Sequence, residues 1–166
     1  MHRRPILLAA LLGAASLLPA LAGAAGEPTV DVKHRIEIDT DTKPGRVLVA
    51  LAVTNQGRST VWIPREMLVE KELTGRRFDL RDFSNRPLDY TGKMVKRAAL
   101  TAADYQAVEP GKMVLNTIDI TQAYAFRKGR HSYNIGYAGP VVTDIKKVDA
   151  LAEFPARPVS FIYTGR

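Results

Sequence analysis

Residues 29–39 read TVDVKHRIEID, and side chains of two kinds alternate strictly along this stretch. One side of the alternation carries Val30, Val32, His34, Ile36 and Ile38. The other side carries the charged residues Asp31, Lys33, Arg35, Glu37 and Asp39. Successive side chains of a strand point to opposite faces of a sheet, so this period of two predicts a half-buried strand. We therefore expect the chain to build its core from the faces of sheets.

The sequence beyond this stretch continues as short strands separated by turns. Pro44 and Gly45 predict a turn, and residues 46–54 then carry apolar side chains on both faces, which predicts a central strand. Further strands are expected at residues 59–64, 77–83, 88–90, 113–120, 130–138 and 158–164. Residues 139–154 are charged and irregular, and no element is predicted there. About seven or eight short strands without a long helix predict an all-β, immunoglobulin-like antiparallel β-sandwich.

Helical structure is expected only as two short turns. One can form within residues 64–72 and the other at residues 101–105, where Thr101 can cap the turn together with Asp104. Tyr124 lies at a corner just before a strand, where the Tyr hydroxyl of immunoglobulin-like domains bonds back to the backbone. This placement supports the same fold class.

The start of the chain has the features of an export signal. Arg3 and Arg4 precede an apolar run that is broken by Pro19 and ends in small residues, so residues 1–24 are expected to be a cleaved signal peptide. A membrane anchor is the alternative, but the run is shorter than the roughly 20 apolar residues that span a bilayer. We expect a periplasmic or secreted protein without a transmembrane segment, in which residues 28–166 form a single domain.

The chain is basic and has no cysteine. It carries 24 Lys and Arg against 17 Asp and Glu, a formal net charge of +7, which becomes +5 when the two arginines of the signal leave. This charge indicates a solvated basic surface, or else attraction to anionic polymers of the envelope or to an acidic partner. A nucleic-acid partner is not expected for an exported chain with dispersed charges. The absence of cysteine excludes disulfides and a cysteine nucleophile.

Residues that could carry catalysis are scarce. Outside the signal the only histidines are His34 and His131, which fall on the apolar sides of their strands and are expected to be partly buried with their hydrogen bonds satisfied. Neither histidine begins a His-Glu-x-x-His motif. Residues 39–45 depart from a calcium loop, because Lys43 and Pro44 replace a ligand and the required glycine. We expect no enzymatic activity, no metal and no cofactor.

Residues 90–112 follow neither a helical nor a strand period, yet they are rich in Tyr, Gly, Lys and Arg. They predict a long connection inside the domain, and binding residues are common in loops on a rigid scaffold. The side chains expected to face a partner are Lys93, Met94, Lys96 and Arg97. Solvated charges without a partner are the alternative for the cations among them.

Several short motifs around this connection resemble a known domain. They are Tyr90-x-Gly92-x-x-Val95-Lys96-Arg97, Thr101-x-x-Asp104-Tyr105, Glu109-Pro110-Gly111, Asp119-Ile120-Thr121-x-Ala123-Tyr124 and Gly129-x-x-x-Tyr133-x-Ile135-x-Tyr137. Over residues 28–138 this order resembles the N-terminal non-catalytic β-sandwich domain of bacterial peptidyl-lysine metalloendopeptidases of the deuterolysin type. No position of this chain matches the zinc ligands or the general base of that family.

The resemblance implies an exported, non-catalytic binding module that is associated with proteolysis. Such a module can act as a pro-domain, an accessory domain or an inhibitor, with a secreted or periplasmic protease or another envelope protein as its partner. The alternative is a structural or anionic-polymer-binding envelope protein, which the net positive charge favours. Binding that weakens with salt would favour the alternative.

Overall fold

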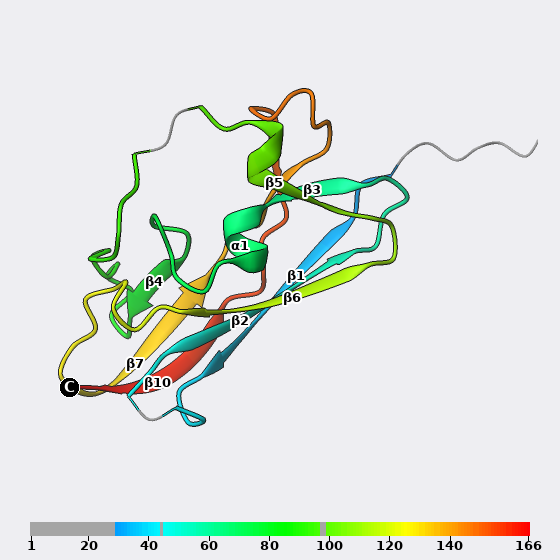
Figure 1. Cartoon of the computed structure of the whole chain (residues 1–166). Helices are drawn as coiled ribbons and strands as arrows, with labels where there is room; N and C mark the ends of the chain where they lie inside the picture. Colours follow the sequence, from blue (N-terminus) through cyan, green and yellow to red (C-terminus); the bar gives the residue numbers. More distant parts are fainter. Residues whose placement is uncertain (1–28, 44, 97–98) are drawn as a thin grey trace, which may run out of the picture.

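A computed structural model describes residues 29–43, 45–96 and 99–166 of the chain (Figure 1). Within these ranges there are ten strands: β1 (Val32–Asp39), β2 (Leu48–Asn55), β3 (Val61–Pro64), β4 (Asp79–Asp82), β5 (Tyr105–Val108), β6 (Met113–Asp119), β7 (Gly129–Gly136), β8 (Pro140–Val142), β9 (Leu151–Glu153) and β10 (Val159–Gly165). The helical elements are α1 (Arg65–Val69) and η1 (Ala102–Asp104). Among the described helices, none is long and apolar enough to cross a membrane. The predicted signal peptide, residues 1–24, lies outside the described residues.

The strands form three antiparallel sheets, with the orders β1-β2-β6, β10-β7-β4 and β5-β3-β8-β9. β2 lies between β1 and β6, as its two apolar faces predict. The register places Ile36 opposite Leu51 on the buried face and Arg35 opposite Ala52 on the other face. The alternation in residues 29–39 therefore arises because one face of β1 is buried and the other is exposed, as the sequence predicts.

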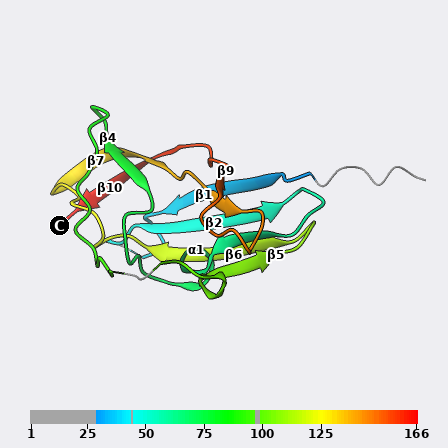
Figure 2. The same cartoon turned by 90° about the horizontal axis from the view of Figure 1, so that it is seen from above.

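The sheets are arranged as layers whose inner faces form the core. β1, β2 and β6 form one layer, and β4, β7 and β10 form another (Figure 2). The largest fully buried side chains are Tyr133, Phe78, Leu51, Ile63, Met67, Leu80, Ile118, Ile120 and Ile135. They come from all three sheets and from α1, so one core joins these elements. The described residues confirm the predicted all-β, antiparallel sandwich.

The predicted corner at Tyr124 is present. The Tyr124 hydroxyl donates to the Phe78 carbonyl at 2.8 Å and accepts from the Phe78 N–H at 3.1 Å. Burial is the main reason that the pKa of Tyr124 rises to about 12. The hydroxyl therefore stays protonated and joins the corner before β7 to the segment that enters β4.

Three strands were not predicted, and one predicted strand is absent. β8 and β9 have three residues each, and β5 has four, so none is long enough to show a clear period of two. Residues 139–154 therefore hold strand structure where the sequence indicates none. The strand expected at residues 88–90 is wrong, because only an isolated bridge between Tyr90 and Tyr124 pairs within it.

The two histidines differ in how deeply they are buried and in whether a buried ring nitrogen lacks a hydrogen-bond partner. His34 is buried, and its Nδ1 lies 2.8 Å from the Phe154 carbonyl oxygen, but its Nε2 has no hydrogen-bond partner. His131 is half-buried, and its Nε2 lies 2.8 Å from the Lys128 carbonyl oxygen. Burial lowers the pKa of His34, and the contact with Phe154 only partly offsets this effect. The expectation of a satisfied, partly buried residue is confirmed for His131 and only half fulfilled for His34.

Candidate functional site

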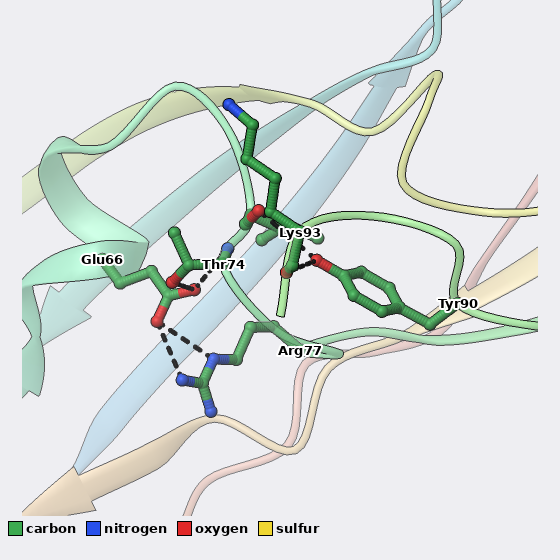
Figure 3. Close-up of polar contacts among 6 residues, drawn as sticks. Glu66, Thr74, Arg77, Tyr90 and Lys93 are labelled. Atoms are coloured by element: carbon green, nitrogen blue, oxygen red, sulfur yellow. Dashed lines mark hydrogen bonds and ion pairs between the residues drawn. The ribbon is translucent and has the colours of Figure 1, made fainter. Parts of the chain in front are cut away.

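The connection after Tyr90 is fixed at its start by the Tyr90 side chain. The Tyr90 hydroxyl lies 2.9 Å from the Lys93 carbonyl oxygen and 3.3 Å from the Leu73 carbonyl oxygen (Figure 3). The Tyr90 ring packs edge-to-face on Tyr124 at 5.4 Å between ring centroids. The first residues of the connection are thus tied to the tyrosine corner.

Backbone hydrogen bonds fix the path of the connection further along. The N–H groups of Thr91 and Gly92 donate to the Ala123 carbonyl at 3.0 and 3.2 Å. The Val95 N–H donates to the Thr74 carbonyl at 3.2 Å. These hydrogen bonds tie residues 90–95 to the corner at Ala123 and to Thr74, although residues 90–95 belong to no strand.

The side chains of the next residues point into solvent. Met94 is 80% exposed and Val95 is 54% exposed. Lys96 is exposed and makes no ion pair or hydrogen bond within the described part of the chain. Arg97, the fourth residue expected at the site, lies outside the described residues. Met94 and Lys96 are thus exposed, with the exposed Val95 between them, and their contact with a partner stays a prediction.

Lys93 differs from its neighbours because it already has a partner within the chain. Its Nζ lies 2.6 Å from the Glu72 carboxylate, whose hydrogen bond and charge raise the pKa of Lys93. Both side chains line an open cleft of about 430 Å³, and an ion pair of 2.8 Å between Arg46 and Asp119 lies in the same cleft. The Lys93 side chain therefore lines this cleft and is held by Glu72, so it is not free to contact a partner.

A buried carboxylate lies on the other side of the connection. Glu66 in α1 is 4% exposed, and its Oε1 accepts from the Thr74 N–H at 3.0 Å and from the Thr74 hydroxyl at 2.9 Å. Its Oε2 accepts from Nη2 and Nε of Arg77 at 2.8 and 3.2 Å (Figure 3). Burial opposes ionisation, but these hydrogen bonds outweigh it, so the pKa of Glu66 lies below its usual value.

Glu66 and Arg77 line a second hollow, of about 230 Å³, which also includes Tyr137. Tyr137 is 3% exposed, and its hydroxyl has no hydrogen-bond partner. Burial raises the pKa of Tyr137 strongly, so the group is a neutral hydroxyl. The rest of the wall is mainly apolar, with Leu100 and Leu151 exposed at the rim.

The sequence reasoning did not identify this second hollow as a site. The one local sign of a buried carboxylate is that Glu66 directly precedes the apolar, buried residues Met67 and Leu68. In the sequence Arg77 is only one of two adjacent arginines, and Tyr137 lies on the apolar side of a predicted strand. Across the described residues, no group of three or more His, Cys, Asp and Glu side chains could hold a metal ion.

Comparisons with known proteins give no family. No family model matches the chain, and no curated protein matches it. Solved structures match at low similarity. One is the X-ray structure of a Northeast Structural Genomics Consortium target, at 11% identity and a TM-score of 0.39, covering 84% of this chain and 88% of that chain. Two others are the putative ApaA protein from Bordetella pertussis, at 14% identity, a TM-score of 0.34 and coverage of 82% and 92%, and the yjhA protein from Bacillus subtilis, at 14%, 0.34, 78% and 85%. At such TM-scores these likenesses carry no conclusion about function.

Proposed function

We propose that this protein is an exported, non-catalytic β-sandwich module that binds a protein partner through residues 94–96. The observation that carries the proposal is the exposure of Met94 and Val95, side by side, in a segment whose path is fixed. Exposed apolar side chains that adjoin one another often mark interaction sites. A fixed segment also loses little conformational entropy when a partner binds it.

The partner that we propose is a secreted or periplasmic protease. The support is the resemblance of the chain to the non-catalytic domain of lysine-specific metalloendopeptidases, together with the unpaired cation of Lys96 beside the apolar pair. In that role the module acts as a pro-domain, an accessory domain or an inhibitor. Export through residues 1–24 belongs to the same proposal.

The test is a binding and inhibition assay between residues 25–166 and a purified deuterolysin-type metalloendopeptidase. We expect binding, and we expect the double variant Met94→Ser, Val95→Ser to weaken it about tenfold or more, as loss of an interface hot spot does. The matched control is Met113→Ser, Leu115→Ser, which changes two similarly exposed apolar residues of β6. Equal affinities for the two double variants, or no binding by the unchanged chain, would contradict the proposal.

A further inference from the structure

The hollow beside Glu66 is a built cavity with walls from separate parts of the chain. Met67 of α1, Tyr105 of β5 and Leu151 of β9 supply apolar wall, and Leu100 and Pro140 extend it toward the opening. These residues are far apart in sequence and meet only in the folded chain. The hollow is therefore a product of the fold and not of one loop.

One polar atom in this wall has no partner. Tyr137 is nine-tenths buried or more, and its hydroxyl makes no hydrogen bond. Its ring is held by an edge-to-face contact with His34, at 5.3 Å between centroids, and by a tilted contact with Phe78 at 5.6 Å. The charges that act on the hydroxyl are those of Arg77 and Glu66, which line the same hollow. Nearly all buried hydroxyls in folded proteins are hydrogen-bonded, so this one calls for a partner from outside the chain.

The charges around the hollow point to a neutral partner. Glu66 and Arg77 form an ion pair with each other, and Arg76 at the rim lies 3.7 Å from Asp79. Glu153, which is exposed, and Asp104, which is half-buried, add two further acidic side chains to the wall. Because the wall has both signs of charge and its buried carboxylate is already paired, it offers no strong field for an anion or a cation.

The size of the hollow sets the size of its ligand. An apolar cavity of about 150 Å³ is large enough to bind benzene in another protein. The hollow here is about 230 Å³, which leaves room for one ring or a branched chain of similar size with one polar group.

We propose that this hollow binds a small, neutral, largely apolar molecule whose single hydroxyl or carbonyl group bonds with the Tyr137 hydroxyl. Neither Met94 nor Val95 lines this hollow, and the proposal goes beyond the binding of a protein partner. Because it is tested on the chain alone, its failure and the failure of protease binding are separate results.

The experiment titrates residues 25–166 with benzyl alcohol, toluene and benzoate and follows backbone amide signals by NMR. We expect saturable shifts at Ala138, Leu151 and Glu153, with benzyl alcohol binding about three- to tenfold more tightly than toluene, the effect of one net hydrogen bond. Benzoate should bind most weakly, because Arg77 and Arg76 are already paired with Glu66 and Asp79 and the wall also carries acidic side chains. In Tyr137→Phe the preference for the alcohol over toluene should vanish, while the fold persists because the lost hydroxyl had no partner.

A second pair of variants tests the place of binding. Leu151→Trp should block the opening and abolish the shifts for all three probes, because Leu151 is half-exposed at the rim. Leu115→Trp, which changes an exposed leucine on β6, should leave the titrations unchanged. The proposal is overturned if no probe gives a saturable shift, because water alone would then be the hydrogen-bond partner of the Tyr137 hydroxyl. An alcohol preference that survives in Tyr137→Phe would overturn it as well.

Discussion

His34 is a buried base whose protonation opposes folding. Its Nε2 has no hydrogen-bond partner, its ring contacts Tyr137, and its pKa lies below the ordinary value of 6.5 because of burial. The unfolded chain therefore binds more protons than the folded chain below pH 6.5. The free energy of unfolding is unaffected by His34 above that pH and decreases as the pH falls through and below it.

We expect the His34→Gln variant to lose much of this pH dependence, because glutamine can donate to the Phe154 carbonyl without titrating. The measurement is urea denaturation of the unchanged chain and the variant at pH 7.5 and pH 5.5. His131→Gln is the matched control and should keep the pH dependence, since it leaves His34 unchanged. A pH dependence that is identical in all three proteins would show that His34 is not the group responsible.

The sequence predicted those features of the site that depend on neighbouring residues, and it missed those that depend on contacts between distant segments. Met94 and Lys96 lie in an irregular, charged segment, and such segments run over the surface, so their exposure followed from sequence. The ion pair of Lys93 with Glu72 joins residues from two separate loops, and no local pattern indicates it. Tyr137 lies on the apolar side of its strand like any core residue, so only the folded chain shows that its hydroxyl lacks a partner.

At the scale of elements, the path of residues 90–95 depends on a close approach at Gly92. A Cβ atom at this position would lie 2.7 Å from the Tyr90 hydroxyl oxygen and 3.1 Å from the Ala123 Cα. Gly92 is not among the glycines with positive φ, so glycine is needed at this position for space and not for backbone conformation. The backbone of the corner and the anchoring tyrosine together leave no room for a methyl group.

We therefore expect Gly92→Ala to destabilise the protein by about 1–3 kcal/mol, the usual cost of overpacking, and to displace the anchored segment. Gly75→Ala is the control and should be nearly neutral, because the nearest atom to its added Cβ is the end of the Arg77 side chain at 3.9 Å. Chemical denaturation gives the stabilities, and amide hydrogen exchange at Val95 reports the anchoring. Equal stabilities for the two variants would contradict the close approach.

The longer strands were predictable because each shows its period of two over seven or eight residues. β1, β2, β6, β7 and β10 all lie where the alternation indicates. β8 and β9 depend on each other and on β3 for pairing, through Trp62 opposite Val142 and Val141 opposite Ala152. Long-range pairing decides such short strands, and local sequence cannot indicate it.

At the scale of the whole molecule, the fold class followed from composition and turn spacing, because many short alternating strands have few ways to bury their faces. The division of the strands into three sheets could not be predicted from the sequence, since it depends on which strand edges pair with one another. The net charge of +7 indicates attraction to anionic partners, whereas the proposal of a protein partner at this site rests on Met94 and Val95, which are exposed side by side. These two side chains predict binding that depends on apolar contact more than on charge.

The most direct test of this claim is the affinity of residues 25–166 for a deuterolysin-type metalloendopeptidase at about 0.1 M and about 1 M salt, since screening is nearly complete at the higher value. We expect a change of less than about threefold between the two salts, because exposed charges contribute little. We also expect Met94→Ser, Val95→Ser to weaken binding at both salts. Binding that disappears at high salt and is unchanged in the double variant would contradict apolar binding and favour attraction to anionic polymers.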